Sequence, residues 1–372
     1  MKIIDGHEII KLFEMWSPKH YALEGDPVGL HIGQLNRKVE KVLVTLDVNE
    51  EVIDEAIKVG ANLIIAHHPP IFRPLKNINT DSPQGKVIEK CIKNDIAVYA
   101  AHTNLDVAPG GVNDLLATQL GLKNTKVLSP TYRETLYKFV VFSPETHAST
   151  IREAMSEQGA GSIGDYEGCS FTTSGVGRFT PIGQANPYLG EVGIEEEVDE
   201  VRIEMIVPHE LRDNVLQALL QVHPYEEPAY DIVKLDQAHN ELGLGRVGQL
   251  EKPLTLTEFA EHVKESFDVP AVRIVGNPTR LVKRVAVLGG DGNKYIYDAK
   301  RSGADVFVTG DLYYHVAHDA EAMGLSIVDP GHHIEKVMID GVANYMTALC
   351  SKEKLAVTFV KSKINTEPFT FI

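Results

Sequence analysis

Histidines and carboxylates gather where four predicted buried strands end. The histidine pair at 67 and 68 directly follows the apolar run NLIIA at 62–66. The other three segments are AHTNLD at 101–106, TGD at 309–311 and DPGHHIE at 329–335. Because ligands of an open α/β sheet bind beyond the carboxyl ends of its strands, these side chains can converge on one cavity. Imidazole nitrogen combined with carboxylate oxygen is the donor mixture that suits Zn, Mn, Fe(II) or Ni.

Five of these side chains form the candidate ligand set: His67, His68, Asp106, His332 and Glu335. His332 and Glu335 are three residues apart, so on the first turn of a helix they share a face. Three histidines and two carboxylates, with room for water, fit two divalent ions about 3.5–4 Å apart better than one. We expect the histidine pair to give one imidazole to each ion, and a carboxylate such as Asp106 to bridge them.

Other polar residues lie beside this set in the sequence. His102 and His315 are the candidates for proton transfer, because an imidazole is half-protonated near neutral pH. Asp311 precedes a predicted helix at 313–323, so we expect it to cap that helix or to support the site. Asp106 precedes the helix expected from about Gly111 by too much to cap it directly. Any one of the 15 histidines is more often a structural residue, but their clustering favours a metal site.

Two passages of the chain, from about 41 to 122 and from about 284 to 352, alternate strand-like and helix-like segments. Such alternation predicts β-α units and a mostly parallel sheet. A single shift of 243 residues places Val42 on Val285 and His68 on Asp311. Matches between small or apolar residues could be coincidence, but the polar match makes coincidence less plausible. We infer two duplicated α/β halves.

The passage between the halves has a different texture. Strand-like segments at 137–144, 198–208 and 228–235 are interleaved with helix-like segments at 148–158 and 210–222 and with a Gly-rich stretch at 159–179. This order predicts an inserted ferredoxin-like α+β domain. The Gly-rich stretch has no phosphate-binding motif and is expected to be a loop or hairpin. The predicted domains are 1–127 and 247–372 for the two halves of the core, and 128–246 for the insert.

Composition excludes several classes of protein. The net charge of −16, without a basic run, makes binding to nucleic acid unlikely. No run of 18 apolar residues occurs, and the first 16 residues predict an amphipathic helix, so neither a membrane span nor a signal peptide is expected. The 3 cysteines lack a C-x-x-C pair, which fits a reducing compartment; we expect a cytoplasmic protein.

Five segments together resemble the Nif-three-like family, whose bacterial members are often called GTP cyclohydrolase I type 2 homologues. The matching segments are GDPVGLHIG at 25–33, AHHPPIF at 66–72, AAHTNLDVAPGGVND at 100–114, TGDLYYHVAHDA at 309–320 and DPGHHIEKV at 329–337. The resemblance covers both halves and implies a two-domain α/β fold with a dinuclear metal site. It places the family's ligands on the five residues named above and leaves the role of His333 ambiguous.

The insert looks like the PII-like or CutA-like trimerising domain found within some members of this family. That resemblance implies a homo-oligomer, plausibly a hexamer built as a trimer of dimers. The segment HPYEEP at 223–228 is interpreted as a tight turn in preference to a second metal or effector site.

The leading functional hypothesis is a metal-dependent hydrolase that acts on a nucleotide or a cyclic C–N substrate, with two divalent ions per chain. Zinc is the first choice of metal, and Fe, Mn or Ni are also compatible with the donors. The alternative is a non-catalytic metal-binding scaffold or a metal-delivery or regulatory ring protein, which the assembly module would favour.

Overall fold

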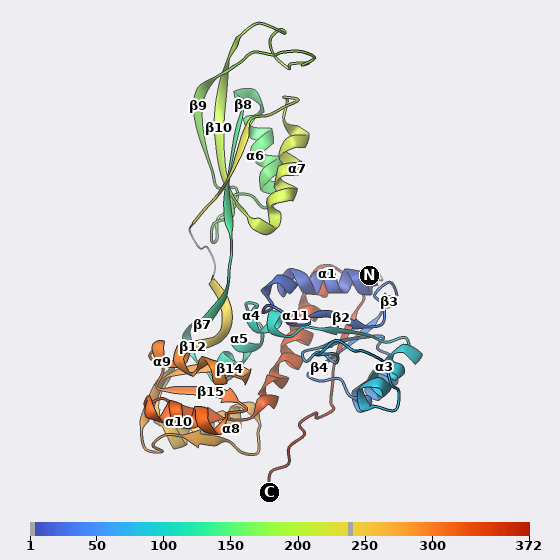
Figure 1. Cartoon of the computed structure of the whole chain (residues 1–372), viewed down its shortest axis with the longest axis vertical. Coiled ribbons are helices and arrows are strands. Elements are labelled where there is room, and N and C mark those ends of the chain that lie inside the picture. Colours follow the sequence, from blue (N-terminus) through green and yellow to red (C-terminus); the bar gives the residue numbers. More distant parts are fainter. Residues whose placement is uncertain (1–3, 237–240) are drawn as a thin grey trace. The chain divides into compact units, whose positions relative to one another are not determined.

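The computed structural model describes residues 4–236 and 241–372. Contacts within the chain divide it into two compact units (Figure 1). Met1–Tyr132 and Leu242–Ile372 form the core unit, and Arg133–Glu241 form the inserted unit. The predicted boundaries at 128 and 246 fall within two strands, β7 (Lys123–Arg133) and β12 (Glu241–Thr255), most of whose residues belong to the core unit.

The first half of the core unit forms a five-stranded sheet in the order β17-β4-β5-β6-β2. Strands β17, β4, β5 and β6 are parallel, and β2 is antiparallel at the edge. The strands are β17 (Thr358–Lys361), β4 (Lys41–Thr45), β5 (Leu63–Ala66), β6 (Ala97–Ala100) and β2 (Gly29–Ile32). The other elements are α1 (Gly6–Trp16), α2 (Glu50–Val59), α3 (Pro83–Lys93), α4 (Thr103–Val107), α5 (Val112–Gln119), the 3₁₀ turn Lys19–Tyr21 and the short pair β1 (Ile4–Asp5) and β3 (Lys38–Val39).

The second half forms a six-stranded sheet in the order β13-β16-β15-β14-β12-β7. Strands β14, β15 and β16 are parallel, whereas β12 and β13 each pair antiparallel with a neighbour. The new strands are β13 (Arg273–Val275), β14 (Leu281–Asp291), β15 (Val306–Gly310) and β16 (Ser326–Asp329). The helices are α8 (Leu256–Phe267), α9 (Ile296–Arg301), α10 (Tyr314–Ala322) and α11 (Val337–Lys352), with 3₁₀ turns at Asn293–Tyr295 and His332–Lys336.

The two sheets repeat the same local register. Val42 on β4 pairs with Leu63 on β5, and Val285 on β14 pairs with Val306 on β15. The shift of 243 residues carries the first pair onto the second, so the duplication predicted from the sequence is confirmed. Because both repeats have parallel strands, their polar residues end up beyond the carboxyl edge of each sheet.

Local signals set where the helices begin and end. The Asp5 side chain accepts from the Glu8 amide and the Glu8 side chain accepts from the Asp5 amide, which is a capping box at the start of α1. The Asn49 side chain caps α2 by accepting from the Val52 amide at 2.9 Å, and Gly60 ends α2 with a left-handed φ of 73°. The buried residues of α1 lie on one face, so the predicted amphipathic helix is confirmed.

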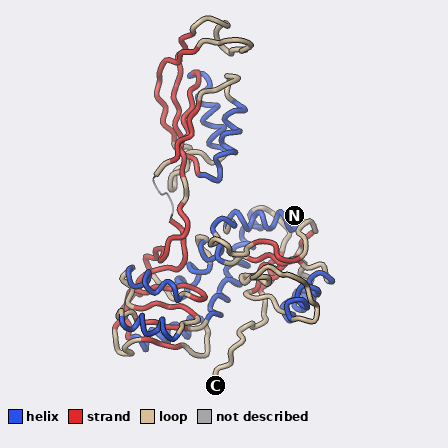
Figure 2. Tube along the Cα trace, in the orientation of Figure 1, coloured by secondary structure: helices blue, strands red, loops and turns tan. Residues whose placement is uncertain are grey.

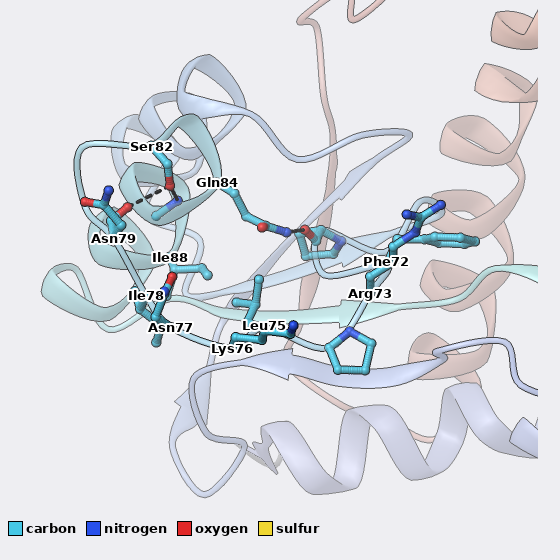
Figure 3. A pocket seen from close by; sticks show the side chains of 13 residues that line it. Phe72, Arg73, Leu75, Lys76, Asn77, Ile78, Asn79, Ser82, Gln84 and Ile88 are labelled. Atoms are coloured by element: carbon cyan, nitrogen blue, oxygen red, sulfur yellow. Dashed lines mark hydrogen bonds between the residues drawn. The ribbon is translucent and has the colours of Figure 1, made fainter.

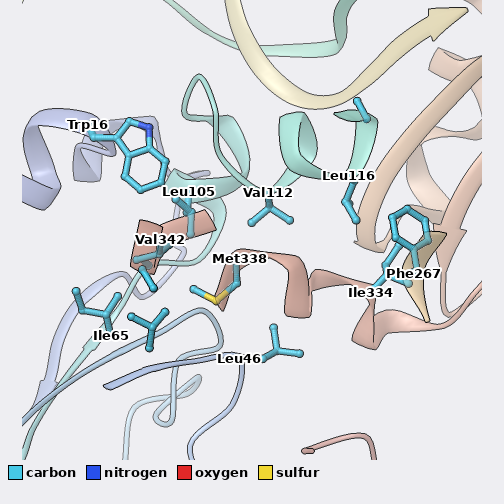
Figure 4. Close-up of a cluster of buried hydrophobic side chains, with 14 of the residues drawn as sticks. Trp16, Leu46, Ile65, Leu105, Val112, Leu116, Phe267, Ile334, Met338 and Val342 are labelled. Carbon is cyan, nitrogen blue, oxygen red and sulfur yellow. The ribbon is translucent and has the colours of Figure 1, made fainter. Parts of the chain in front are cut away.

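One hydrophobic core joins the two halves (Figure 4). Leu46 and Ile65 of the first half pack in the same cluster as Val308 of the second half, and Met338 and Val342 of α11 contribute to it. All five side chains are almost fully buried. Each such side chain stabilises the fold by roughly 1.5–3 kcal/mol relative to exposure. The shared core fixes the start of α11, and with it the turn that carries His332 and Glu335.

The inserted unit has the predicted ferredoxin-like topology. Its strands β8 (Leu136–Pro144), β9 (Ser170–Phe179), β10 (Glu196–Pro208) and β11 (Tyr230–Lys234) form an antiparallel sheet in the order β11-β8-β10-β9. Helices α6 (Ala148–Glu157) and α7 (Arg212–Val222), each preceded by a 3₁₀ turn at Glu145–His147 and His209–Leu211, lie on one side of this sheet (Figures 1 and 2). The second part of the Gly-rich stretch is strand β9, the first arm of a hairpin with β10.

Among the described residues, no helix is both long and apolar enough to cross a membrane.

We predict that the core unit folds without the inserted unit. The backbone of Gly243 packs against Ser129 and that of Gly248 packs against Lys123, so β7 and β12 lie side by side where the insert leaves and returns. Removing residues 134–240 and joining the ends with a short Gly/Ser linker should leave one cooperative thermal unfolding transition.

A longer deletion, of 128–246, is the control. It removes Arg246, which is 4% exposed and donates to Asp114 at 2.9 Å in the core unit. The longer deletion leaves Asp114 without this partner and shortens both β7 and β12, so it should be less stable than the shorter one. Loss of cooperative unfolding in the shorter variant would show that the two units do not fold separately.

Candidate metal centre

The predicted ligand residues converge on one cavity of ≈ 710 Å³ in the core unit. His67 and His68 follow β5 directly, Asp106 lies on α4 just after β6, and His332 and Glu335 lie on the 3₁₀ turn that follows β16. His68, Asp106, His332 and Glu335 line the cavity itself, and His67 is fully buried behind them. The two halves of the core therefore contribute to the same site.

One group of donor atoms is formed by His67, Asp106 and Glu335. His67 Nε2 lies 3.6 Å from Asp106 Oδ1 and 3.8 Å from Glu335 Oε1. All three residues are buried. His67 Nε2 and Asp106 Oδ1 are buried polar atoms without a hydrogen-bond partner, which is costly unless something else binds them. Donors on a tetrahedral ion with bonds of about 2.1 Å lie about 3.4 Å apart, so these atoms have the spacing that an ion requires.

A second group of donor atoms is formed by His68, His332 and Glu335. His68 Nε2 is 3.0 Å from Glu335 Oε2, and His332 Nε2 is 3.1 Å from the same oxygen. Glu335 thus presents one oxygen to each group. Asp106 comes close only to the first group, so the expectation that Asp106 is the bridging carboxylate has no support from this geometry.

The Nδ1 atom of each of the three histidines contacts an oxygen atom that orients the ring. His67 Nδ1 lies 2.7 Å from the carbonyl oxygen of Ala101. The corresponding partners are Asp47, at 2.7 Å from His68 Nδ1, and Asp311, at 2.7 Å from His332 Nδ1. Because the Nδ1 atom of each ring contacts one of these acceptors, Nε2 is the ring nitrogen that is directed at the other donor atoms of the site. Metal-ligating histidines are usually oriented by such partners.

Glycines on β14 allow the backbone to approach the Glu335 carboxylate. A Cβ atom at Gly290, where φ is 62°, would lie 2.9 Å from Glu335 Oε1 and 3.2 Å from His332 Nε2. A Cβ atom at Gly289 would lie 2.8 Å from the same glutamate oxygen. Any larger residue would therefore push the carboxylate out of its position between the two groups.

Burial and hydrogen bonding shift the pKa values of the site residues in opposite directions. Burial lowers the pKa of His68, but hydrogen bonds to Asp47 and Glu335 outweigh it and raise that pKa to about 10. His332 behaves likewise, and its pKa rises to about 9. Burial raises the pKa of Asp106, whereas contacts with His332 and His67 hold the pKa of Glu335 well below its usual range. The site therefore favours the negative form of Glu335 beside the histidines and disfavours the negative form of Asp106.

His102 also lies at this site, and it forms a third possible donor group with His67 and His68. Its ring is 5.3 Å from that of His67 and 5.9 Å from that of His68, measured between centroids, and it lines the cavity. His102 Nδ1 is 2.8 Å from Asp26 Oδ1, and the other oxygen of Asp26 accepts from the Thr103 amide at 3.0 Å. The contact with Asp26 therefore fixes the orientation of the imidazole.

The structure does not bring His315 into this site. His315 is exposed on α10, its ring packs against that of Tyr314, and it is not among the residues that line the cavity. His333 is also outside the two donor groups, and its nearest polar partner is Thr366 at 3.4 Å. His315 therefore lies away from the cavity that was expected to hold it, and His333 is not among the possible donors.

Several supporting residues were not predicted. Asp47 and Asp26 hold His68 and His102, and the hydroxyl of Thr366 donates to Asp47 at 2.5 Å. Asn113 donates to the Asp106 carbonyl at 3.0 Å and accepts from the Gly289 amide at 3.1 Å, so it joins the two halves. Asp47 could have been found, because it follows the end of β4, the strand beside β5, as Asp311 follows the end of β15.

The family model for Duf34/NIF3 (NGG1p interacting factor 3) matches residues 4–368. A Bacillus subtilis protein named GTP cyclohydrolase 1 type 2 homolog is 56% identical over 371 residues, with 100% of each chain covered. The crystal structure of a Bacillus cereus protein related to NIF3 matches with a TM-score of 0.95, 57% identity and 100% of both chains covered. A Staphylococcus aureus structure matches with a TM-score of 0.83 and 34% identity, again over 100% of both chains.

We predict that Asp106→Asn lowers the metal content without destabilising the metal-free chain. Asparagine keeps the size of the side chain but removes the negative charge beside His67. The raised pKa of Asp106 means that ionisation of this carboxyl costs stability as pH rises above the unfolded value of 3.8. At neutral pH, the metal-free variant should therefore unfold at the same temperature as the native chain or higher.

Asp291→Asn is the matched control. Asp291 lines the same cavity and accepts a hydrogen bond from Tyr313 at 2.7 Å, but it belongs to neither donor group. Elemental analysis and thermal unfolding on one sample of each variant give both quantities. Full metal occupancy in Asp106→Asn would remove this residue from the ligand set.

Proposed function

We propose that this chain, which belongs to the Duf34/NIF3 family, is a hydrolase that depends on two divalent metal ions. Its substrate would be a nucleotide or another molecule with a cyclic C–N bond, because relatives of this length and identity are named GTP cyclohydrolase 1 type 2 homologs. The first ion would be held by His67, Asp106 and Glu335 and the second by His68, His332 and Glu335.

One observation carries this proposal: the two oxygens of Glu335 face different donor groups. Each of these two groups contains three donor atoms that lie within 4.8 Å of one another. Two ions about 3.5–4 Å apart, bridged by Glu335, would use all of them. Such ions would also partner the buried atoms His67 Nε2 and Asp106 Oδ1.

A pair of divalent ions supplies Lewis-acid activation of water and of the substrate. The residues of the chain would orient the metal ligands and transfer protons. Asp47 and Asp311 keep the Nε2 atoms of His68 and His332 directed at the cavity. His102, fixed by Asp26, is the group placed to accept a proton from water and return it to the leaving nitrogen. Zinc suits the three imidazoles and two carboxylates best, and Fe(II), Mn or Ni would also be accepted.

The cycle of metal removal and restoration tests whether the chain is an enzyme. After chelation, hydrolysis of GTP and of a panel of cyclic amides should be lost, and it should return when zinc, manganese, iron(II) or nickel is added. Glu335→Gln should hold fewer than two ions and lose turnover. Glu24→Gln, which changes a carboxylate of the same cavity outside both donor groups, should keep its metal. A fully loaded native chain with no turnover on any substrate would favour the scaffold function instead.

Self-association into a homohexamer is the second part of the proposal. The helices of the inserted unit lie on one side of its sheet, and β9 is a 10-residue edge strand whose residues are mostly exposed. Phe171 and Val176 on this strand are 67% and 52% exposed. Long exposed edges of this kind invite pairing with another chain. Light scattering should give the mass of six chains for the native protein, and a monomer would contradict the assembly.

A further inference from the structure

The loop between β5 and α3 encloses a second cavity, of ≈ 450 Å³, in the core unit. Phe72 and Arg73 lie side by side at one end of this loop pocket, and Asn79 and Ser82 lie at the other (Figure 3). The loop is tied down at both ends. Gln84 donates to the Pro70 carbonyl at 2.8 Å, and Ser82 caps α3 by accepting from the Gly85 amide at 3.1 Å. These hydrogen bonds therefore fix the two ends of the loop that lines the pocket.

The charge of the loop pocket differs from that of the rest of the molecule. Arg73 and Lys76 are among its lining residues, and no aspartate or glutamate is. Neither cation has a carboxylate partner in the described part of the chain, although the chain as a whole carries a net charge of −16. Both residues are exposed. Two cations that line a pocket without carboxylates attract an oxyanion, because no carboxylate of the described chain pairs with them.

The loop pocket adjoins the metal cavity. Phe72 lines both cavities, and Pro69 and Pro70 line one each. Four carboxylates outside the donor groups, those of Glu24, Asp26, Asp47 and Asp291, line the metal cavity. Among the described residues that line the metal cavity, Lys294 is the only lysine or arginine. The loop pocket thus offers positive side chains next to the metal cavity, and no carboxylate among its described lining residues competes with an anion for them.

We propose that the loop pocket is a subsite for an oxyanion group of the substrate, a phosphate or a carboxylate, bound by Arg73 and Lys76. This inference rests on the proposed function, because it assumes that the bond to be hydrolysed lies in the metal cavity. The ring of Phe72 stands between the two cavities, where a planar part of the same molecule can pack against it. Arg73 and Lys76 would then determine which substrates are accepted.

The test compares binding of guanosine, guanosine 5′-monophosphate and ribose 5-phosphate to the metal-loaded full chain by calorimetry. The two phosphorylated probes should bind the native chain about tenfold or more tightly than guanosine, because a hydrogen bond to a charged group contributes that much. Succinate in place of phosphate tests whether a carboxylate is the preferred oxyanion. In the double variant Arg73→Gln, Lys76→Gln, this advantage should disappear while guanosine affinity and metal content stay the same.

The double variant Lys58→Gln, Lys126→Gln is the matched control, because it removes two exposed positive charges elsewhere on the core unit. It should keep the advantage of the oxyanion probes. The proposal is overturned if no phosphorylated or carboxylate probe binds the native chain better than guanosine, or if both double variants lose affinity equally. Binding through Arg73 and Lys76 without hydrolysis of any probe would leave the subsite in place and contradict only the proposed function.

Discussion

The buried carboxylate of Glu335 is the interaction on which the rest of this site depends. It is 3% exposed, and an unpaired charge at that depth would cost several kcal/mol. Its partners come from both halves of the core: His67 and His68 follow β5, and His332 precedes it on the same 3₁₀ turn. The turn that carries Glu335 can therefore be buried only when both halves are folded together. The hydrophobic core around α11, to which both halves contribute, holds them together.

Parallel strand order explains why so much of the site could be predicted from the sequence. Strands read as β-α units must be parallel, and residues that follow such strands must meet at one edge of the sheet. His67 and His68 follow β5 of the first sheet, and residues 330–335 follow β16 of the second, so the rule places each group at the edge of its own sheet. Which carboxylate lies between the donor groups could not be predicted, because that depends on the turn at 332–336 and on the glycines of β14 that make room for it.

Supporting residues were harder to predict than the candidate ligands. Asp26 reaches His102 from a loop that lies 76 positions away in the sequence, and Thr366 reaches Asp47 from 319 positions away. Spacing along the chain carries no information about such contacts. The sequence left open whether the Gly-rich stretch is a loop or a hairpin, and the reason is different. Strand β9 pairs along its length with β10 but buries little, so its sequence lacks the alternation of apolar and polar residues that marks a half-buried strand.

The central claim is that two ions lie on opposite sides of Glu335. Crystals of the zinc-loaded chain, measured at the zinc absorption edge, test it directly by anomalous scattering. We expect two peaks about 3.5–4 Å apart, one beside His67 and Asp106 and the other beside His68 and His332, with one oxygen of Glu335 near each. A single peak, or two peaks that do not share Glu335, would contradict the account.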